Sequence, residues 1–173
     1  MILAAAASPE DQVAGVVEYL GRYNISCRSR YGPPHSFGML WLDIEAPQLW
    51  SRSQADNRNF IQGMMDEAAR QHVALGIYTS ESQWVPIVGD WTGGAKYPLW
   101  CVCHRADALC GNACVAGMGA DCLVAWRGRY AHYDNNPSFS DFTSFGGWSH
   151  PSIKQYTGTS DICGASIDND WYP

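Results

Sequence analysis

The sequence predicts an α/β fold, because a buried strand, an amphipathic helix and a second buried strand follow one another along the chain. The apolar runs 39–44 and 73–78 have the length and composition of strands buried in a sheet. Between them, apolar residues recur at three- and four-residue spacing from Ser53 to His72, which is typical of a helix with one apolar face. The residues of this face are Phe60, Ile61, Met64, Met65, Ala68 and His72. Strand, helix and strand in this order form a βα unit of a parallel sheet.

A further helix is expected near the amino terminus, from Ser8 to about Tyr23. Ser8 is a suitable N-cap residue, and Pro9 suits the first helical position. The preceding segment 1–7 lacks a basic start and is too short for a signal peptide. No apolar run approaches the roughly 18 residues of a transmembrane helix, so no membrane partner is expected.

Two carboxylates separated by one residue, Asp43 and Glu45, end the first buried strand. Side chains alternate along a strand, so both acids emerge on the same face. Two neighbouring acids in a partly apolar setting resist ionising together, and their pKa values should separate. Cleavage of a glycosidic bond requires one protonated acid and one ionised carboxylate. The plain alternative is a surface pair on an ordinary strand.

The composition describes one globular domain, with 46% hydrophobic residues and a net charge of −6. The negative charge argues against nucleic acid as a partner. Eight Trp and nine Tyr are compatible with carbohydrate binding, since sugar rings pack their C–H faces on aromatic side chains. Candidate sugar contacts near predicted strand ends or loops are Tyr78, Trp100, Tyr133 and Trp148. Tyr78 and Trp148 are the stronger candidates, and the alternative is that these aromatics belong to the core.

Six segments of the chain form an ordered set of motifs. They are WLDIE, GIYTSESQW, YPLW, YAHYDN, SFGGWSHPSIKQY and CGASIDNDWYP. In this order they resemble the lysozymes of glycoside hydrolase family 25, over residues 8–100 and 130–173. The resemblance implies an irregular, flattened TIM-like (β/α) barrel. It also implies a muramidase that cleaves the β-1,4 bond between N-acetylmuramic acid and N-acetylglucosamine in peptidoglycan.

The same resemblance assigns roles to individual residues. Glu45 matches the proton donor of the family and Asp43 its paired carboxylate. Asp168 matches the acid on the last strand, and Tyr78 matches a tyrosine at a strand end that lines the sugar site. No cofactor and no metal are expected. The expected partner is the glycan strand of peptidoglycan, bound by a monomer that is secreted or delivered to lysosomes or phagosomes.

Two departures from the family pattern affect the expected fold. The early barrel strands and an aspartate near the family's start are missing, so the barrel in the single domain 1–173 is expected to be incomplete. The second departure is a Cys-rich insert at 101–129, which holds five of the seven cysteines. It is interpreted as translated intron or misassigned exon sequence, with two alternatives, a zinc site and a disulfide knot. The zinc ligands would come from Cys101, Cys103, His104, Cys110, Cys114 and Cys122. Outside the insert, Cys27 and Cys163 could form one disulfide or remain two thiols.

Three functions remain open from the sequence. The first is a muramidase with Glu45 as general acid, and the second is a catalytically impaired, carbohydrate-binding remnant of the same fold. The third is another sugar hydrolase of the D-x-x-D-x-D-x-E type. That motif is disfavoured because Trp41 stands where it requires an acid.

Overall fold

A five-stranded sheet organises residues 7–27, 36–102 and 133–173, which are the residues that the computed structural model describes. Its strands, in spatial order, are β3 (Leu40–Asp43), β4 (Leu75–Thr79), β5 (Leu99–Val102), β6 (Ile153–Ile162) and β7 (Ala165–Trp171). The first four run parallel, and β7 pairs antiparallel with β6. A separate parallel pair joins β1 (Ser26–Cys27) to β2 (Ser36–Phe37). The carboxyl ends of β3, β4 and β5 therefore meet at one edge.

The helices form largely as the sequence predicts. Helix α1 (Pro9–Gly21) begins after Ser8, whose Oγ accepts a hydrogen bond from the Asp11 amide at 3.1 Å. Helix α2 (Gln54–Arg70) is capped in the same way by Ser53. It ends before the predicted boundary at His72, because that residue adopts a left-handed φ of 57° and turns the chain toward β4. A short 3-10 helix η1 (Pro47–Leu49) and helix α3 (Glu81–Val88) complete the set.

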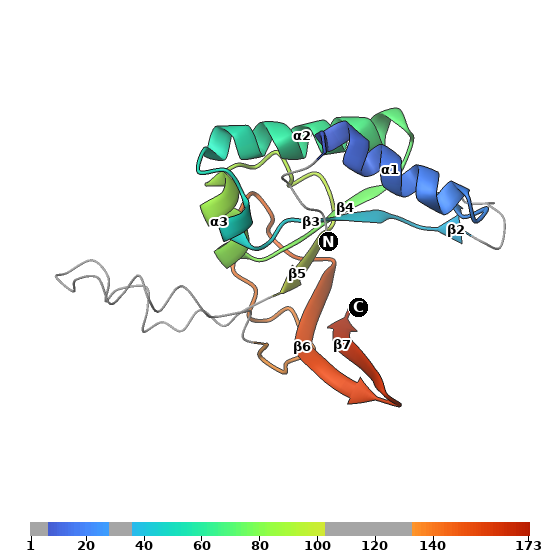
Figure 1. The fold of residues 1–173 in the computed structure, drawn as a ribbon. Coiled ribbons are helices and arrows are strands. Elements are labelled where there is room, and N and C mark those ends of the chain that lie inside the picture. Colours follow the sequence, from blue (N-terminus) through green and yellow to red (C-terminus); the bar gives the residue numbers. More distant parts are fainter. Residues whose placement is uncertain (1–6, 28–35, 103–132) are drawn as a thin grey trace.

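The two faces of the sheet have different surroundings. On one face Leu42, Ile44, Ile77 and Leu99 are buried in a core shared with α1, α2 and α3. In Figure 1, α1 and α2 run side by side, and α3 lies beside the sheet near η1. On the other face side chains such as those of Trp41, Asp43, Tyr78 and Trp100 are only half-buried. Alternation along the strands thus separates an apolar face under the helices from a polar and aromatic face.

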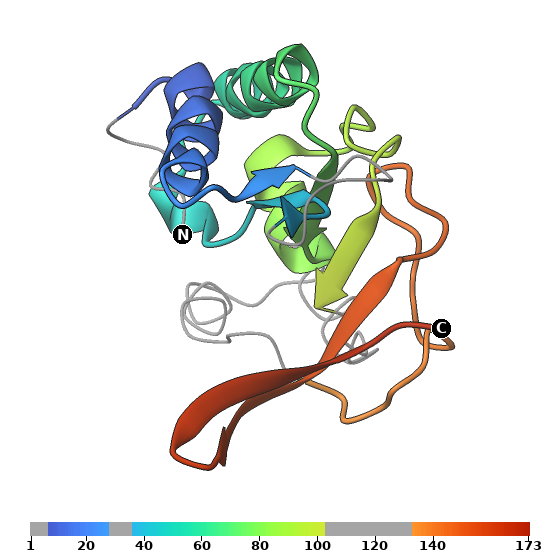
Figure 2. The same ribbon diagram turned by 90° about the vertical axis from the view of Figure 1, so that its right-hand side faces the viewer.

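Strands β6 and β7 form a long twisted hairpin that extends away from the helices, as Figures 1 and 2 show. The pairing shifts register between Gln155 and Thr157 and again between Thr157 and Ser160. Such irregularities bend a strand and redirect its side chains. The first of them follows Gln155 immediately, at the part of β6 that lies beside β5.

The mixed α/β class is confirmed, and the five-stranded sheet has β3 and β7 at its two edges. Of the two alternatives for Cys27 and Cys163, a disulfide or two thiols, the structure shows two free thiols. The Cys-rich insert, with its alternative zinc ligands, lies outside the described residues except for Cys101 and Val102 at the end of β5. Among the described helices, none has the length and apolarity needed to cross a membrane.

Candidate active site

The chain leaves β3 through a turn that presents Glu45. Asp43 is the last residue of the strand, and Ala46 adopts a left-handed φ of 55°. Three hydrogen bonds hold the backbone of this turn. Thr79 Oγ1 donates to the Ile44 carbonyl at 2.7 Å, and Trp50 Nε1 donates to the Glu45 carbonyl at 2.8 Å. Gln83 Oε1 accepts the Ala46 amide at 3.0 Å, so the main chain around Glu45 is fixed from both sides.

A pocket opens beside this turn at the carboxyl ends of the parallel strands. It is lined by Glu45, Tyr78, Thr79, Ser80, Gln83, Val102 and Tyr133. The β3–β4 register pairs Asp43 with Tyr78, and the β4–β5 register pairs Tyr78 with Trp100. In parallel α/β sheets, this edge is where ligands bind.

The two acids at the end of β3 are held in a setting that disfavours their charge. Burial raises the pKa of Asp43 above its ordinary value. Burial, followed by repulsion from Asp43, raises the pKa of Glu45 as well. Among the described residues, neither carboxylate has a cationic partner in an ion pair, and the buried Oδ1 of Asp43 has no hydrogen-bond partner. Glu45 therefore keeps its proton more readily than an ordinary glutamate, as a general acid requires.

The third predicted acid, Asp168 of β7, is linked to the site by Gln155 of β6. Gln155 Nε2 donates to Asp168 Oδ2 at 2.6 Å, and Tyr78 Oη donates to Gln155 Oε1, also at 2.6 Å. The Tyr133 hydroxyl lies 3.4 Å from the same Gln155 nitrogen. Repulsion from Asp168 and Glu45 adds to burial in raising the pKa of Tyr133. The structure therefore brings Asp43, Glu45, Asp168 and the two tyrosines to one edge of the sheet.

An aromatic surface continues the site along the half-buried face of the sheet. The Trp100 ring packs edge-on against Trp41 and Tyr78, with ring centroids 5.5 Å and 5.1 Å apart. Trp100 Nε1 donates to Asp170 Oδ1 at 2.9 Å, which orients the indole. Burial nevertheless raises the pKa of Asp170. Trp100 and Tyr78 can offer flat surfaces to a sugar ring.

Trp148 does not join this group, contrary to the prediction that it contacts substrate. It is only 4% exposed, and its Nε1 donates to the Tyr97 carbonyl at 2.9 Å. Its ring packs edge-on against the buried Trp84, 4.9 Å away between centroids. The Gly146–Gly147 turn, in which both glycines have positive φ, inserts the indole into the core. The structure thus assigns Trp148 to the alternative role of a core residue.

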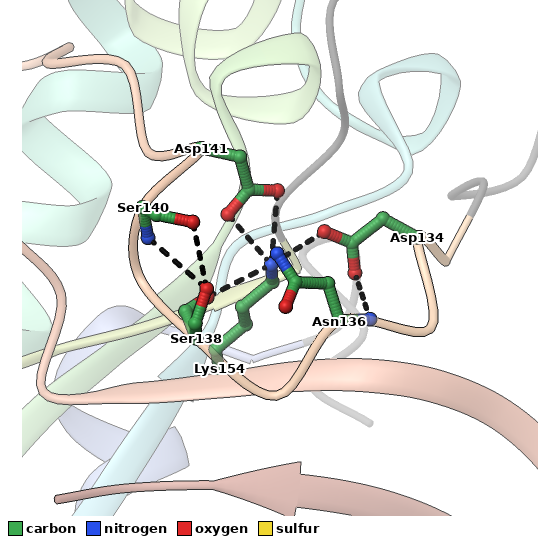
Figure 3. Close-up of polar contacts among 6 residues, drawn as sticks. All are labelled: Asp134, Asn136, Ser138, Ser140, Asp141 and Lys154. Carbon is green, nitrogen blue, oxygen red and sulfur yellow. Dashed lines mark hydrogen bonds and ion pairs between the residues drawn. The ribbon is translucent and has the colours of Figure 1, made fainter.

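Sequence reasoning did not identify Gln83 or Gln155, because an isolated glutamine carries no recognisable spacing or charge pattern. It also missed an ion cluster on the opposite face of the sheet, drawn in Figure 3. There the fully buried Lys154 Nζ lies 2.6 Å from Asp134 Oδ2 and 2.8 Å from Asp141 Oδ1, and donates to the Ser138 carbonyl at 3.0 Å. Burial opposes ionisation of Asp134, but its hydrogen bonds with Asp141 and Lys154 hold its pKa below the ordinary value.

Comparison with known proteins places this geometry in a family. A family profile described as lysozyme-like protein 1 matches residues 4–112. The chain is 40% identical over 162 residues to a Dictyostelium discoideum protein named "Probable GH family 25 lysozyme 2", an alignment that covers 94% of this chain and 58% of the relative. It is 36% identical to "Probable GH family 25 lysozyme 4" of the same organism, over 96% of this chain and 59% of the relative. The chain belongs to the glycoside hydrolase family 25 lysozymes.

A solved structure has a similar fold. The muramidase from Trichobolus zukalii superposes with a TM-score of 0.59 at 17% identity, over 99% of this chain and 64% of that one. At this identity the likeness concerns the fold alone. The chain spans about three fifths of the length of the curated family 25 relatives it matches, 58% and 59% for the two named above.

Proposed function

We propose that this chain carries the catalytic cleft of a muramidase that hydrolyses the β-1,4 bond between N-acetylmuramic acid and N-acetylglucosamine in peptidoglycan. The observation that carries the proposal is the acid pair at the end of β3. Asp43 and Glu45 both have raised pKa values, and no described cation neutralises them. They stand beside Tyr78 in a pocket at the carboxyl ends of the strands. Family membership supports the same reaction.

In this proposal Glu45 is the general acid. Its proton passes to the glycosidic oxygen as the bond to the anomeric carbon breaks, and the leaving sugar departs as an alcohol. Positive charge develops on the ring of the sugar that remains, and the carboxylates of Asp43 and Asp168 stabilise it. Water then supplies the hydroxyl group at the anomeric carbon, and its proton returns to Glu45. The hydrogen bond that Gln155 donates to Asp168 Oδ2 orients that carboxyl group. Tyr78, Trp100 and Tyr133 supply hydroxyl and aromatic contacts to the sugars.

The finer architecture follows the same proposal. The described sheet would be part of a TIM-like barrel, and residues 1–173 would form one lysozyme domain interrupted by the insert at 101–129. The glycan strand of peptidoglycan would be the partner of a monomeric enzyme that acts outside the cell or in lysosomes and phagosomes. The 40% identity to a protein named as a probable family 25 lysozyme supports the assignment of a lysozyme domain.

The test is the release of soluble muropeptides from purified peptidoglycan by the wild-type chain, a Glu45→Gln variant and a Glu10→Gln control. Glu10 is an exposed residue in the first turn of α1. We expect release by the wild type and by Glu10→Gln, and a loss of about a thousandfold in Glu45→Gln, since general acids contribute roughly 10²–10⁴-fold to a rate. Full activity in Glu45→Gln would contradict the assignment of the acid. Binding of peptidoglycan without release by the wild type would select a carbohydrate-binding function instead.

A further inference from the structure

Gln155 of β6 connects candidate site residues of β4 and β7. It is 3% exposed, at the point where β6 lies between β5 and β7. Its amide oxygen accepts from Tyr78 Oη of β4, and its amide nitrogen donates to Asp168 Oδ2 of β7. The same nitrogen also lies 3.4 Å from the Tyr133 hydroxyl. No other described side chain contacts both Asp168 and Tyr78 by hydrogen bonds.

The direction of these hydrogen bonds follows from chemistry. An ionised carboxylate only accepts hydrogen bonds, so Asp168 must face the NH₂ group of Gln155. The amide oxygen must then face Tyr78, and it can only accept. The Tyr78 hydroxyl is therefore the donor, and its proton is directed toward β6 and away from the pocket.

We propose that Gln155 is a positioning residue for the lysozyme reaction, which fixes the hydroxyl proton of Tyr78 and the carboxylate of Asp168 so that both present only acceptor lone pairs to the substrate. The proposal rests on the function proposed above. It predicts which polar groups of a sugar can bind beside Tyr78 and Asp168. A bound sugar must offer N–H or O–H donors to Tyr78 and Asp168.

The electrostatics of this region support that rule. The ionisable groups that face Gln155 and its partners are Asp43, Glu45, Tyr78, Tyr133, Asp168 and Asp170. Burial, followed by repulsion from Glu45, raises the pKa of Tyr78, so its hydroxyl keeps its proton. The neighbouring Lys154 is committed to Asp134 and Asp141 on the opposite face of the sheet. Nothing cationic among the described groups thus competes with Gln155 for Asp168.

The discriminating variant is Gln155→Glu, with Gln155→Met as its matched control. Glutamate keeps the shape of glutamine and can still accept from Tyr78. When ionised, it cannot donate to Asp168, and it places a like charge against that residue. When protonated, its O–H donates to Asp168 as the amide did. Two carboxyl groups within hydrogen-bonding distance of each other share one proton, and the pKa of that proton is raised. Methionine fills the same space without either hydrogen bond.

We expect kcat/KM of Gln155→Glu to be at least about tenfold below wild type at pH 7, the cost of losing a hydrogen bond to a charged group. The deficit should shrink to about threefold or less near pH 5, where the pair of acids keeps its shared proton. Gln155→Met should show a deficit that does not recover on acidification. If both variants lose the same activity at every pH, Gln155 only fills space and the proposal is overturned.

A second measurement needs no activity, and it separates this proposal from the proposed function. The raised pKa of the new pair in the folded state stabilises the variant below the unfolded-state pKa, and this contribution is lost as the pH rises. The melting temperature of Gln155→Glu should therefore approach that of wild type at acid pH and fall behind it as the pH increases. Gln155→Met should show a constant difference. A pH-independent difference in Gln155→Glu would overturn the contact between Gln155 and Asp168, even if the wild type releases no muropeptides.

Discussion

Two acidic clusters lie on opposite faces of the same sheet, and neighbouring residues of β6 belong to each of them. The Lys154 side chain points to Asp134 and Asp141 on the face under the helices. The Gln155 side chain points to Asp168 on the polar and aromatic face, called the open face below. In the first cluster two carboxylates share a buried ammonium group, and the pKa of Asp134 is lowered. On the open face Asp43 and Glu45 have no described cation, and their pKa values are raised.

The difference separates a structural use of carboxylates from a chemical one. A carboxylate that is paired with a buried lysine is held ionised and contributes to the fold. A carboxylate that is half-buried without a cation keeps its proton more readily, as an acid catalyst requires. Figure 3 shows how carboxylates of the first kind tie the loop 134–141 to Lys154 of β6.

Removing the cation from the paired cluster should have the largest effect on stability. Lys154→Met removes the buried ammonium group that compensates the partly buried Asp134 and Asp141, and we expect a loss of about 3–5 kcal/mol in the free energy of unfolding. The matched control Lys96→Met, at an exposed lysine, should change it by less than about 0.5 kcal/mol. Chemical denaturation at pH 7 measures both.

The pH dependence sharpens this prediction. In the wild type, the lowered pKa of Asp134 gives a stability that is present above the unfolded pKa and lost as the pH falls through the folded one. In Lys154→Met the carboxylates lose their counter-ion, so stability should instead recover on acidification. A variant as stable as wild type at pH 7 would show that the cluster contributes little to the fold.

An intermediate effect is expected from Gly158→Ala. A Cβ at this position of β6 would meet the Tyr133 ring at 2.1 Å, so the ring, which lines the pocket, must shift. We expect a loss of about 1–3 kcal/mol in stability and a raised KM. Gly38→Ala is the control, since its Cβ would meet nothing within 4 Å. An unchanged KM in Gly158→Ala, with stability reduced, would remove Tyr133 from the substrate contacts.

The smallest effect on stability, and one of opposite sign, is expected from Asp43→Asn. The raised pKa of Asp43 means that its charge at neutral pH destabilises the folded state, in which burial penalises it. Neutralising it should stabilise the fold at pH 7 by less than about 1 kcal/mol, because the carboxyl is only partly removed from solvent. Muropeptide release should fall at the same time. Thermal unfolding at pH 7 and pH 3 tests this, since the gain should vanish where Asp43 is already protonated.

The sequence predicts the elements whose pattern is local. The N-caps Ser8 and Ser53, the apolar face of α2 and the buried strands β3 and β4 follow from periodicity and residue type. The acid pair can also be predicted from the sequence, because alternation along a strand places Asp43 and Glu45 on one side.

Features that depend on tertiary contacts cannot be predicted from the local sequence pattern. Trp148 follows a glycine turn in the sequence like a loop residue, yet that turn directs it into the core against Trp84. Gln155 and Lys154 acquire their roles from partners on β4, β7 and the loop 134–141, which sequence spacing does not bring together. The end of α2 before His72 depends on a left-handed residue that carries no glycine signal.

The central claim is that partial desolvation, followed by repulsion from Asp43, raises the pKa of the Glu45 carboxyl group above its ordinary value. The most direct measurement is the pKa of Glu45, from the pH titration of its side-chain carbon signal by NMR, in the wild type and in Asp43→Asn. We predict a value above the ordinary glutamate range in the wild type. In Asp43→Asn it should move part of the way back, because burial remains when repulsion is removed. An ordinary pKa in the wild type, or no change in Asp43→Asn, would contradict the account.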